Sequence, residues 1–159
     1  MKKNVMSLLL GAAGTVSGFA GGMYLAGKET SKTEEKRKKM VEFYNLLLEW
    51  LSVKQQGKNL ASYFVKNNYK TVAIYGMKEL GERLYYELKD SNIQIKYAID
   101  KNADDIVSDV CILNPDDLLE PVDVVVVTAI HYFDEIESEL SGVIDADIVS
   151  LEDVVFGID

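Results

Sequence analysis

The sequence predicts an α/β fold, a Rossmann-like parallel five-stranded sheet in the order 3-2-1-4-5, with an N-terminal transmembrane helix and a helical neck. Three observations predict it. The apolar segment Thr71–Tyr75 leads through a glycine turn into a helix. Four valines in a row, 124–127, need cover on both faces, as strands of a parallel sheet do. Residues 4–27 carry no charged side chain.

The charge is divided unevenly between the two halves of the chain. Residues 1–70 hold twelve Lys or Arg and five Asp or Glu, a balance of +7, whereas residues 71–159 hold five and twenty-one, a balance of -16. An acidic domain repels phosphate backbones, so we expect no nucleic-acid partner. Cys111 is the only cysteine and His131 the only histidine, which excludes an intramolecular disulfide and a His/Cys zinc site, and we expect no metal.

The 159 residues fit one domain with an appendage. We predict three segments: a transmembrane anchor at 1–28, a basic and then amphipathic helical neck at 29–69, and a Rossmann-like α/β domain at 70–159. The uncharged segment 4–27 is long enough as a helix to span a hydrocarbon core of about 30 Å. A cleaved signal peptide and a buried soluble helix are the alternatives.

Positive charge decides the orientation of the anchor, because Lys and Arg are retained on the cytoplasmic side. Lys28, Lys32 and the four basic residues at 36–39 outnumber Lys2 and Lys3. We therefore expect a single-pass protein of the cell membrane with a cytoplasmic globular domain. The basic run can also lie on anionic lipid headgroups.

Three glycines in the predicted anchor are spaced by four residues: Gly14, Gly18 and Gly22. This spacing puts them on one helix face, where two backbones can approach closely. It predicts a homodimer or pairing with another membrane protein.

The neck has the periodicity of an amphipathic helix. Its apolar stripe consists of Met40, Phe43, Tyr44, Leu47, Leu48 and Leu51. Gly57 should interrupt the helix, and Asn67-Asn68 should end a second helical segment. We expect these stripes to pack on the α/β domain, or on each other in a dimer.

The domain begins with a βαβ unit. Strand Thr71–Tyr75 is followed by helix Glu79–Leu88 and strand Ile95–Ile99, and Asp100 lies 24 residues after Gly76. In dinucleotide-binding folds the glycine allows a sharp turn, the helix N-terminus attracts phosphate, and the acidic residue accepts hydrogen bonds from a ribose.

The turn departs from the G-x-G-x-x-G pattern at one position. It reads Gly76, Met77, Lys78, Glu79, Leu80 and Gly81, so the first and third glycines are present and Lys78 replaces the second. Lys78 could supply charge to a phosphate or fill the phosphate's place, and Glu79 would repel an anion. Retained and lost dinucleotide binding are both open.

Further strands and helices continue the alternation. We expect strands at Val107–Leu113, Val122–Thr128 and Asp147–Ser150, and helices at Tyr132–Leu140 and Leu151–Phe156.

In a sheet of order 3-2-1-4-5 the ligand crevice lies at the carboxyl ends of the first and fourth strands. The segments Gly76–Leu80, Asp100 and Thr128–His131 should meet there. The candidate cofactor-binding residues are Gly76, Met77, Lys78, Glu79, Leu80, Gly81, Asp100, Thr128 and His131.

Four segments resemble Rossmann-like nucleotide-binding domains encoded among bacterial surface-polysaccharide and glycosyltransferase genes. They read LLEWLSVK from Leu47, YFVKNNYKTVAIYGMKELGERLYYEL, KYAIDKN and VDVVVVTAIHYFDEI. The similarity covers about residues 47–156, and the family usually has G-M-G-E-L-G where this chain has Lys78. It implies NAD(P) or a nucleotide sugar as ligand, and a role in glycan assembly.

The sequence assembles no catalytic group. His131 follows the fourth strand, where a ligand contact belongs, but no serine or cysteine is paired with it. Cys111 is expected as a small buried residue of the third strand. We predict a membrane-anchored nucleotide-binding module that is not itself catalytic. The alternatives are an NAD-dependent enzyme acting on nucleotide sugars and a structural adaptor without a ligand.

Overall fold

The computed structural model describes residues 31–158, so the predicted anchor and its three glycines lie outside the described residues. The chain divides into two compact units, Met1–Tyr44 and Asn45–Asp159. The described part of the first unit is helical, and in the sequence this helix runs over residues 31–55. Within residues 31–158, no helix combines the length and the apolar character needed to cross a membrane.

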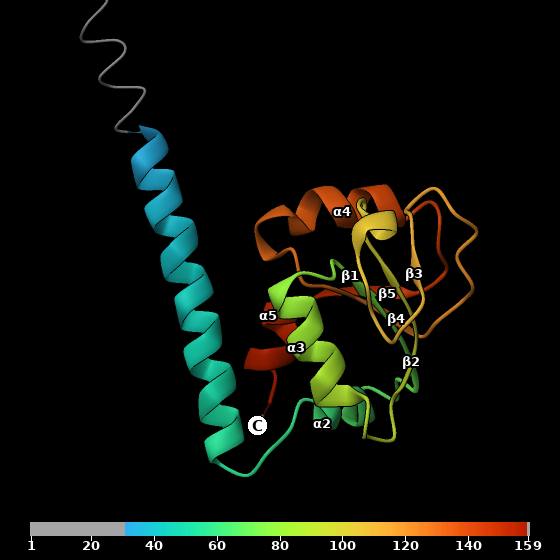
Figure 1. Ribbon diagram of the computed structural model, residues 1–159. Helices are drawn as coiled ribbons and strands as arrows, with labels where there is room; N and C mark the ends of the chain where they lie inside the picture. Colours follow the sequence, from blue (N-terminus) through green and yellow to red (C-terminus); the bar gives the residue numbers. More distant parts are fainter. Residues whose placement is uncertain (1–30, 159) are drawn as a thin grey trace, which may run out of the picture. The chain divides into compact units, whose positions relative to one another are not determined.

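The second unit has an α/β fold with five parallel strands in the order β3-β2-β1-β4-β5, which confirms the predicted sheet (Figure 1). The strands are β1 Thr71–Tyr75, β2 Gln94–Ile99, β3 Ile112–Leu113, β4 Val124–Val127 and β5 Asp147–Ser150. The central strand β1 pairs with β2 on one side and β4 on the other, with Tyr75 opposite Ile99 and Val127. The sheet order therefore reverses beside β1.

Helices cover both faces of this sheet. They are α2 Ala61–Lys66, α3 Glu79–Leu88, α4 Phe133–Leu140 and α5 Leu151–Phe156, with short 3-10 helices at Ala103–Asp105 and Ile130–Tyr132. In Figure 1, α4 lies on one face of the sheet and α2, α3 and α5 lie on the other. This arrangement explains why all four residues of β4 are fully buried.

Alternate residues of the strands divide the core between the two faces. Ala73, Val125 and Val127 belong to one buried cluster together with Ile136 and Leu140 of α4. The intervening strand residues, which point to the opposite face, are equally buried, as are Leu84 and Leu88 of α3. The capping box of Ser150 and Asp153 then starts α5 directly at the end of β5.

The third strand is shorter than predicted. Only Ile112–Leu113 pair with β2, and residues 107–111 form no strand. Val107 is fully exposed and Cys111 is exposed, so the expectation that Cys111 is buried in a strand was wrong. β3 has one neighbour in the sheet, β2. The segment before β3 contains polar residues that favour contact with water over pairing in a strand: Asp104, Asp105, Ser108 and Asp109.

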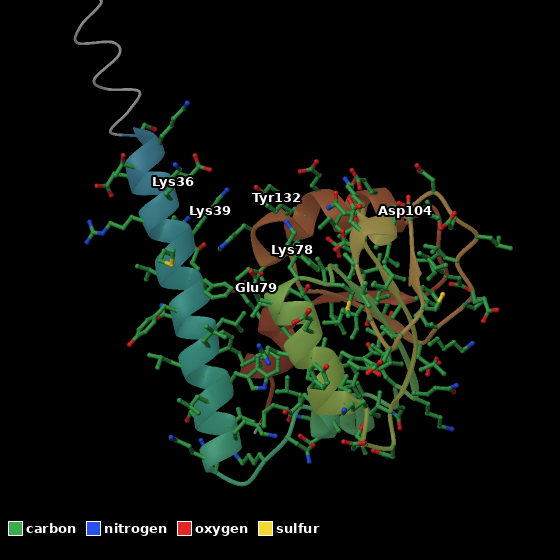
Figure 2. All side chains as sticks on the ribbon, viewed as in Figure 1. Lys36, Lys39, Lys78, Glu79, Asp104 and Tyr132 are labelled. Carbon is green, nitrogen blue, oxygen red and sulfur yellow. The ribbon has the colours of Figure 1, made fainter. Side chains whose placement is uncertain are left out.

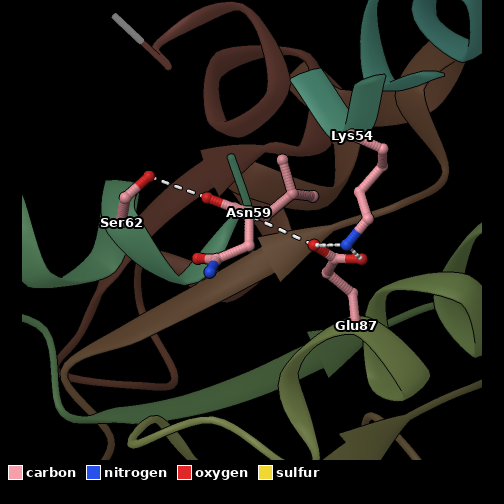
Figure 3. A network of polar contacts seen from close by, with 5 residues as sticks. Lys54, Asn59, Ser62 and Glu87 are labelled. Carbon is pink, nitrogen blue, oxygen red and sulfur yellow. Dashed lines mark hydrogen bonds and ion pairs between the residues drawn. The ribbon is translucent and has the colours of Figure 1, made fainter. Parts of the chain in front are cut away.

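Residues 45–55 of the helix belong to the second unit and contribute side chains to the core of that unit. Leu46 is 0% exposed, and Trp50 and Val53 are also buried. Both carboxylate oxygens of Glu87 on α3 lie 2.8 Å from Lys54 Nζ, and Glu87 Oε1 also accepts a 3.3 Å hydrogen bond from the Leu60 N–H (Figure 3). Glu87 therefore connects the end of the helix to α3 and to the start of α2.

The predicted breaks in the neck are present. The helix ends at residue 55, and Gly57 follows with a φ of +74°. Asn67 is the C-cap of α2, and Asn68 adopts a φ of +62°, a conformation that Asn tolerates better than most residues. The chain can therefore turn from α2 into β1 over two residues.

Replacing Leu46 by Ala tests whether the helix is part of the folded domain. We expect a loss of about 2–5 kcal/mol in the free energy of unfolding, because a fully buried leucine leaves a cavity. Leu118→Ala is the matched control, since Leu118 is 93% exposed and its truncation should change stability by less than about 0.5 kcal/mol. Denaturant unfolding measures the stability of both variants. If Leu46→Ala destabilised the protein no more than Leu118→Ala, Leu46 would not pack in the core.

Candidate functional site: the glycine turn at the carboxyl edge of the sheet

The turn Gly76–Gly81, here called the glycine turn, follows β1 at the point where the sheet order reverses. Gly76 has a φ of +92°, which favours glycine, and its N–H donates to Ile99 O at 2.7 Å. A Cβ on Gly76 would lie 2.8 Å from Thr128 Oγ1. Both the backbone conformation and the close side chain therefore require glycine at this position.

Gly81 is required for a different reason. It lies in the first turn of α3, and a Cβ there would be 1.9 Å from the carbonyl oxygen of Gly76. The absence of a side chain lets α3 pack directly against the glycine turn. The first and third glycines of the sequence pattern thus both have a structural purpose in this chain.

Asp100 and Thr128 hold the glycine turn from its two sides. The Met77 N–H donates to Asp100 Oδ2 at 2.9 Å, and Thr128 Oγ1 donates to Gly76 O at 2.6 Å and lies 3.0 Å from Tyr75 O. Asp100 and Thr128 are each 6% exposed. The crevice segments expected from the sequence are therefore joined here by hydrogen bonds within the protein.

The carboxylate of Asp100 has little capacity left for a ligand. Oδ1 accepts hydrogen bonds from the backbone N–H of Asn102 at 2.9 Å and from its side-chain amide at 3.4 Å, in addition to the bond from Met77 to Oδ2. A carboxylate offers about four acceptor sites, so three are used and about one remains. The predicted contact with a ribose stays a prediction, limited to a single hydrogen bond.

The remaining residues of the glycine turn divide into buried and exposed positions. Met77 and Leu80 are buried, with 3% and 7% exposure. Lys78 and Glu79 are exposed at the start of α3 (Figure 2). Lys78 is the N-cap residue of α3, in extended conformation, and its side chain makes no capping hydrogen bond.

The first turn of α3 is therefore suited to an external acceptor. The first N–H groups of an α-helix have no partner within the helix, and the side chain of Lys78 cannot accept a hydrogen bond for them. Anions are favoured at this end of a helix. Glu79 is a competing anion in the same turn, as the sequence indicated.

His131 follows β4 in the segment Thr128–His131 expected at the crevice. It belongs to the 3-10 helix Ile130–Tyr132 and is partly exposed. It lines an open pocket of about 230 Å³ together with neighbours that include Asp134 and Glu135. The two carboxylates disfavour an anion in this pocket, so a ligand contact by His131 fits a neutral or cationic group better than a phosphate.

Tyr75 is a residue of this region that the sequence did not single out. It is the last residue of β1, it is 4% exposed, and its hydroxyl has no hydrogen-bond partner among residues 31–158. Burial raises the pKa of the Tyr75 phenol; the charge of Lys101 lowers it, and that of Glu139 raises it. A tyrosine that ends an otherwise apolar strand is the signal that could have identified it.

Lys101 and Glu139 form an ion pair beside Tyr75, with Nζ 3.5 Å from Oε2. Both side chains are about half exposed, so water screens the attraction and the pair adds little to stability. Within residues 31–158, no group of three His, Cys, Asp or Glu side chains could hold a metal ion.

Comparison of the chain with protein-family models, with curated proteins and with solved structures finds no match in any of the three.

Gly81→Ala tests the contact between α3 and the glycine turn. We expect a loss of about 3 kcal/mol or more in the free energy of unfolding, because the new methyl group meets backbone that cannot move aside cheaply. Gly142→Ala is the control, since a Cβ at Gly142 meets nothing within 4 Å, and it should change stability by less than about 1 kcal/mol. Thermal or urea unfolding compares them. A tolerated Gly81→Ala would mean that α3 does not rest on the turn.

Tyr75→Phe tests the buried hydroxyl. Removing a polar group that has no partner should raise the free energy of unfolding by about 1 kcal/mol. Tyr97→Phe should lower it by about 1 kcal/mol, because the similarly buried Tyr97 hydroxyl donates a 2.6 Å hydrogen bond to Glu120 O. The two variants thus differ in sign. Destabilisation by Tyr75→Phe would indicate that the hydroxyl has a partner in solution.

Proposed function

We propose that this protein is a membrane-anchored, Rossmann-like nucleotide-binding module, not itself catalytic, that acts in or regulates bacterial surface-polysaccharide assembly. One observation carries the binding proposal. At the reversal of the sheet order, a glycine with positive φ leads into α3, whose N-cap Lys78 has no capping side-chain bond. Parallel α/β sheets bind ligands at such a reversal.

The position of Lys78 supports an anionic ligand. A cation at a helix N-terminus is unfavourable in the field of the helix dipole, so Lys78 does not help to start α3. Its ammonium group would instead add to the attraction of the helix N-terminus for a phosphate. The exposed position of Lys78 makes it available for that contact.

The ligand class follows from the groups that surround the glycine turn. The helix N-terminus and Lys78 suit phosphate oxygens, and the remaining acceptor site of Asp100 suits one ribose hydroxyl. NAD(P) and nucleotide sugars contain both groups. Because Lys78 replaces the glycine that lets a pyrophosphate approach the backbone, we favour a phosphate held at the side chain rather than deep in the turn.

The cellular role rests on the sequence. The uncharged segment 4–27, followed by the basic residues at 28–39, supports an anchor with the domain on the cytoplasmic side. The resemblance of residues 47–156 to domains encoded with polysaccharide genes supports a role in glycan assembly. Binding without turnover is proposed because the sequence shows no assembled set of catalytic side chains.

Ligand-induced thermal stabilisation of the purified chain in detergent tests the binding proposal. NAD(H), NADP(H), UDP-sugars and coenzyme A are the probes. A ligand at one hundred times its dissociation constant should add about 2.7 kcal/mol to the stability of the domain. Lys78→Ala should weaken this effect, whereas Lys89→Ala, at the C-terminal end of the same helix, should leave it unchanged.

Three other outcomes have distinct meanings. If no probe stabilises the wild type but one stabilises Lys78→Gly, the lysine fills the place of the phosphate and the protein has lost its ligand. If none stabilises either protein, the binding proposal is wrong and a structural adaptor is the better description. Conversion of a nucleotide sugar by the wild type would show an enzyme.

A further inference from the structure

The helix over residues 31–55 has apolar side chains on two sides, and only one side is covered within the second unit. Leu46, Trp50 and Val53 are buried against the domain. Leu47 and Leu51 are 39% and 52% exposed. Large exposed apolar side chains that lie next to one another mark an interaction surface more often than scattered ones do.

The exposed side continues onto α3 as an apolar groove. A pocket of about 360 Å³ is lined by Leu47, Trp50, Leu51 and Lys54 from the helix and by Arg83, Tyr86 and Glu87 from α3. Tyr86 is itself 53% exposed. The groove and the exposed leucines form one continuous surface on the second unit, mainly apolar and bordered by Lys54, Arg83 and Glu87, here called the neck face.

The spacing of the exposed residues is that of a coiled-coil seam. Leu47 and Leu51 are four residues apart, and in the sequence the pattern extends to Tyr44 and Met40 with spacings of three and four. Tyr44 is 59% and Met40 is 67% exposed. Alternating spacings of three and four residues favour the packing of two helices along a shared axis.

We propose that the neck face is covered by the neck face of a second copy of this chain, in a parallel dimer. This inference rests on the proposed membrane anchoring. The uncharged segment ends at Gly27, four residues before the described helix begins at residue 31. Two anchored copies therefore present their neck helices in the same direction, at the same height above the membrane and at high effective concentration.

A second copy also fits the surface itself. In a parallel two-fold dimer each residue of the seam meets its own counterpart, so Leu47 of one copy packs on Leu47 of the other, and Leu51 on Leu51. Leu48, next to Leu47 in the sequence, is apolar too and is 46% exposed. Dimerisation places two domains, each with its own glycine turn, side by side at the membrane.

Disulfide cross-linking of the full-length chain in liposomes tests the parallel seam. Cys111 is exposed, so each variant is made in a Cys111→Ser background that holds a single new cysteine. Leu47→Cys and Leu51→Cys should form a dimer under mild oxidation at least about tenfold faster than Asn45→Cys, because a disulfide requires Cβ atoms about 4 Å apart. Asn45 is an exposed control on the same helix, away from the seam.

A pair of charged substitutions provides a second test. Leu47→Glu combined with Leu51→Glu brings like charges together across the seam, while neither side chain is needed in the core of one copy. Light scattering in detergent should give a dimer for the wild type and for Asn45→Glu, and a monomer for the double variant with an unchanged melting temperature. A double variant that remains dimeric overturns the inference.

Other occupants of the neck face give different results. If Leu51→Cys is protected from alkylation while the chain is monomeric, the segment 4–27 of the same chain covers the face and the dimer is wrong. Equal cross-linking at positions 45, 47 and 51 also overturns it.

Flotation with the liposomes separates this inference from the proposed anchor. If the chain floats but Leu47→Cys and Leu51→Cys do not cross-link faster than Asn45→Cys, the proposed anchor stands and the proposed dimer is wrong. If the chain does not float, the proposed anchor is wrong. The same comparison of cross-linking rates, made in solution, then tests the proposed dimer.

Discussion

The close approach of α3 to the end of β1 is the constraint on which the carboxyl edge of the sheet depends. Gly81 brings its Cα to the carbonyl of Gly76, where any Cβ would lie 1.9 Å from the oxygen. Gly76 accommodates this by a positive φ, and Asp100 and Thr128 fix the turn through hydrogen bonds to its backbone. The position of α3 relative to β1 and β4 follows from these contacts.

The same contacts determine what the candidate site can still bind. Groups that hold the turn are unavailable to a ligand: the Met77 N–H is bonded to Asp100, and the Thr128 hydroxyl to backbone carbonyls. In the proposed site a phosphate would therefore be held by the N–H groups at the start of α3 and by the exposed ammonium group of Lys78, while Asp100 keeps one acceptor site for a ribose hydroxyl. The proposed site would be shallower and more charge-dependent than a glycine-rich turn, since Lys78 and the helix dipole would attract a phosphate and Glu79 would oppose it.

The neck contributes to the domain as well as preceding it. Leu46, Trp50 and Val53 complete the core on the side of α3, and Glu87 ties the end of the helix to α3 and α2. One face of the helix is therefore buried when the domain folds. Leu47 and Leu51, on the side of the helix next to Trp50, are only partly covered within the second unit, and the proposed dimer of necks would use them without exposing Leu46 or Val53.

The sequence by itself determined the strands β1, β2 and β5, the centre of β4 and the helices, because their apolar periodicity, glycines and asparagines act locally. The strand order was predicted from the βαβ pattern of doubly wound sheets, and the four valines of β4 indicated cover on both faces. The sequence did not determine the length of β3 or the exposure of Cys111, since an edge strand depends on its single neighbour. It identified Asp100 and Thr128 as crevice residues but not that their oxygens are bonded to the turn, and it did not reveal Tyr75. Those features depend on atoms far apart in the sequence, and only the tertiary structure brings them within hydrogen-bonding distance.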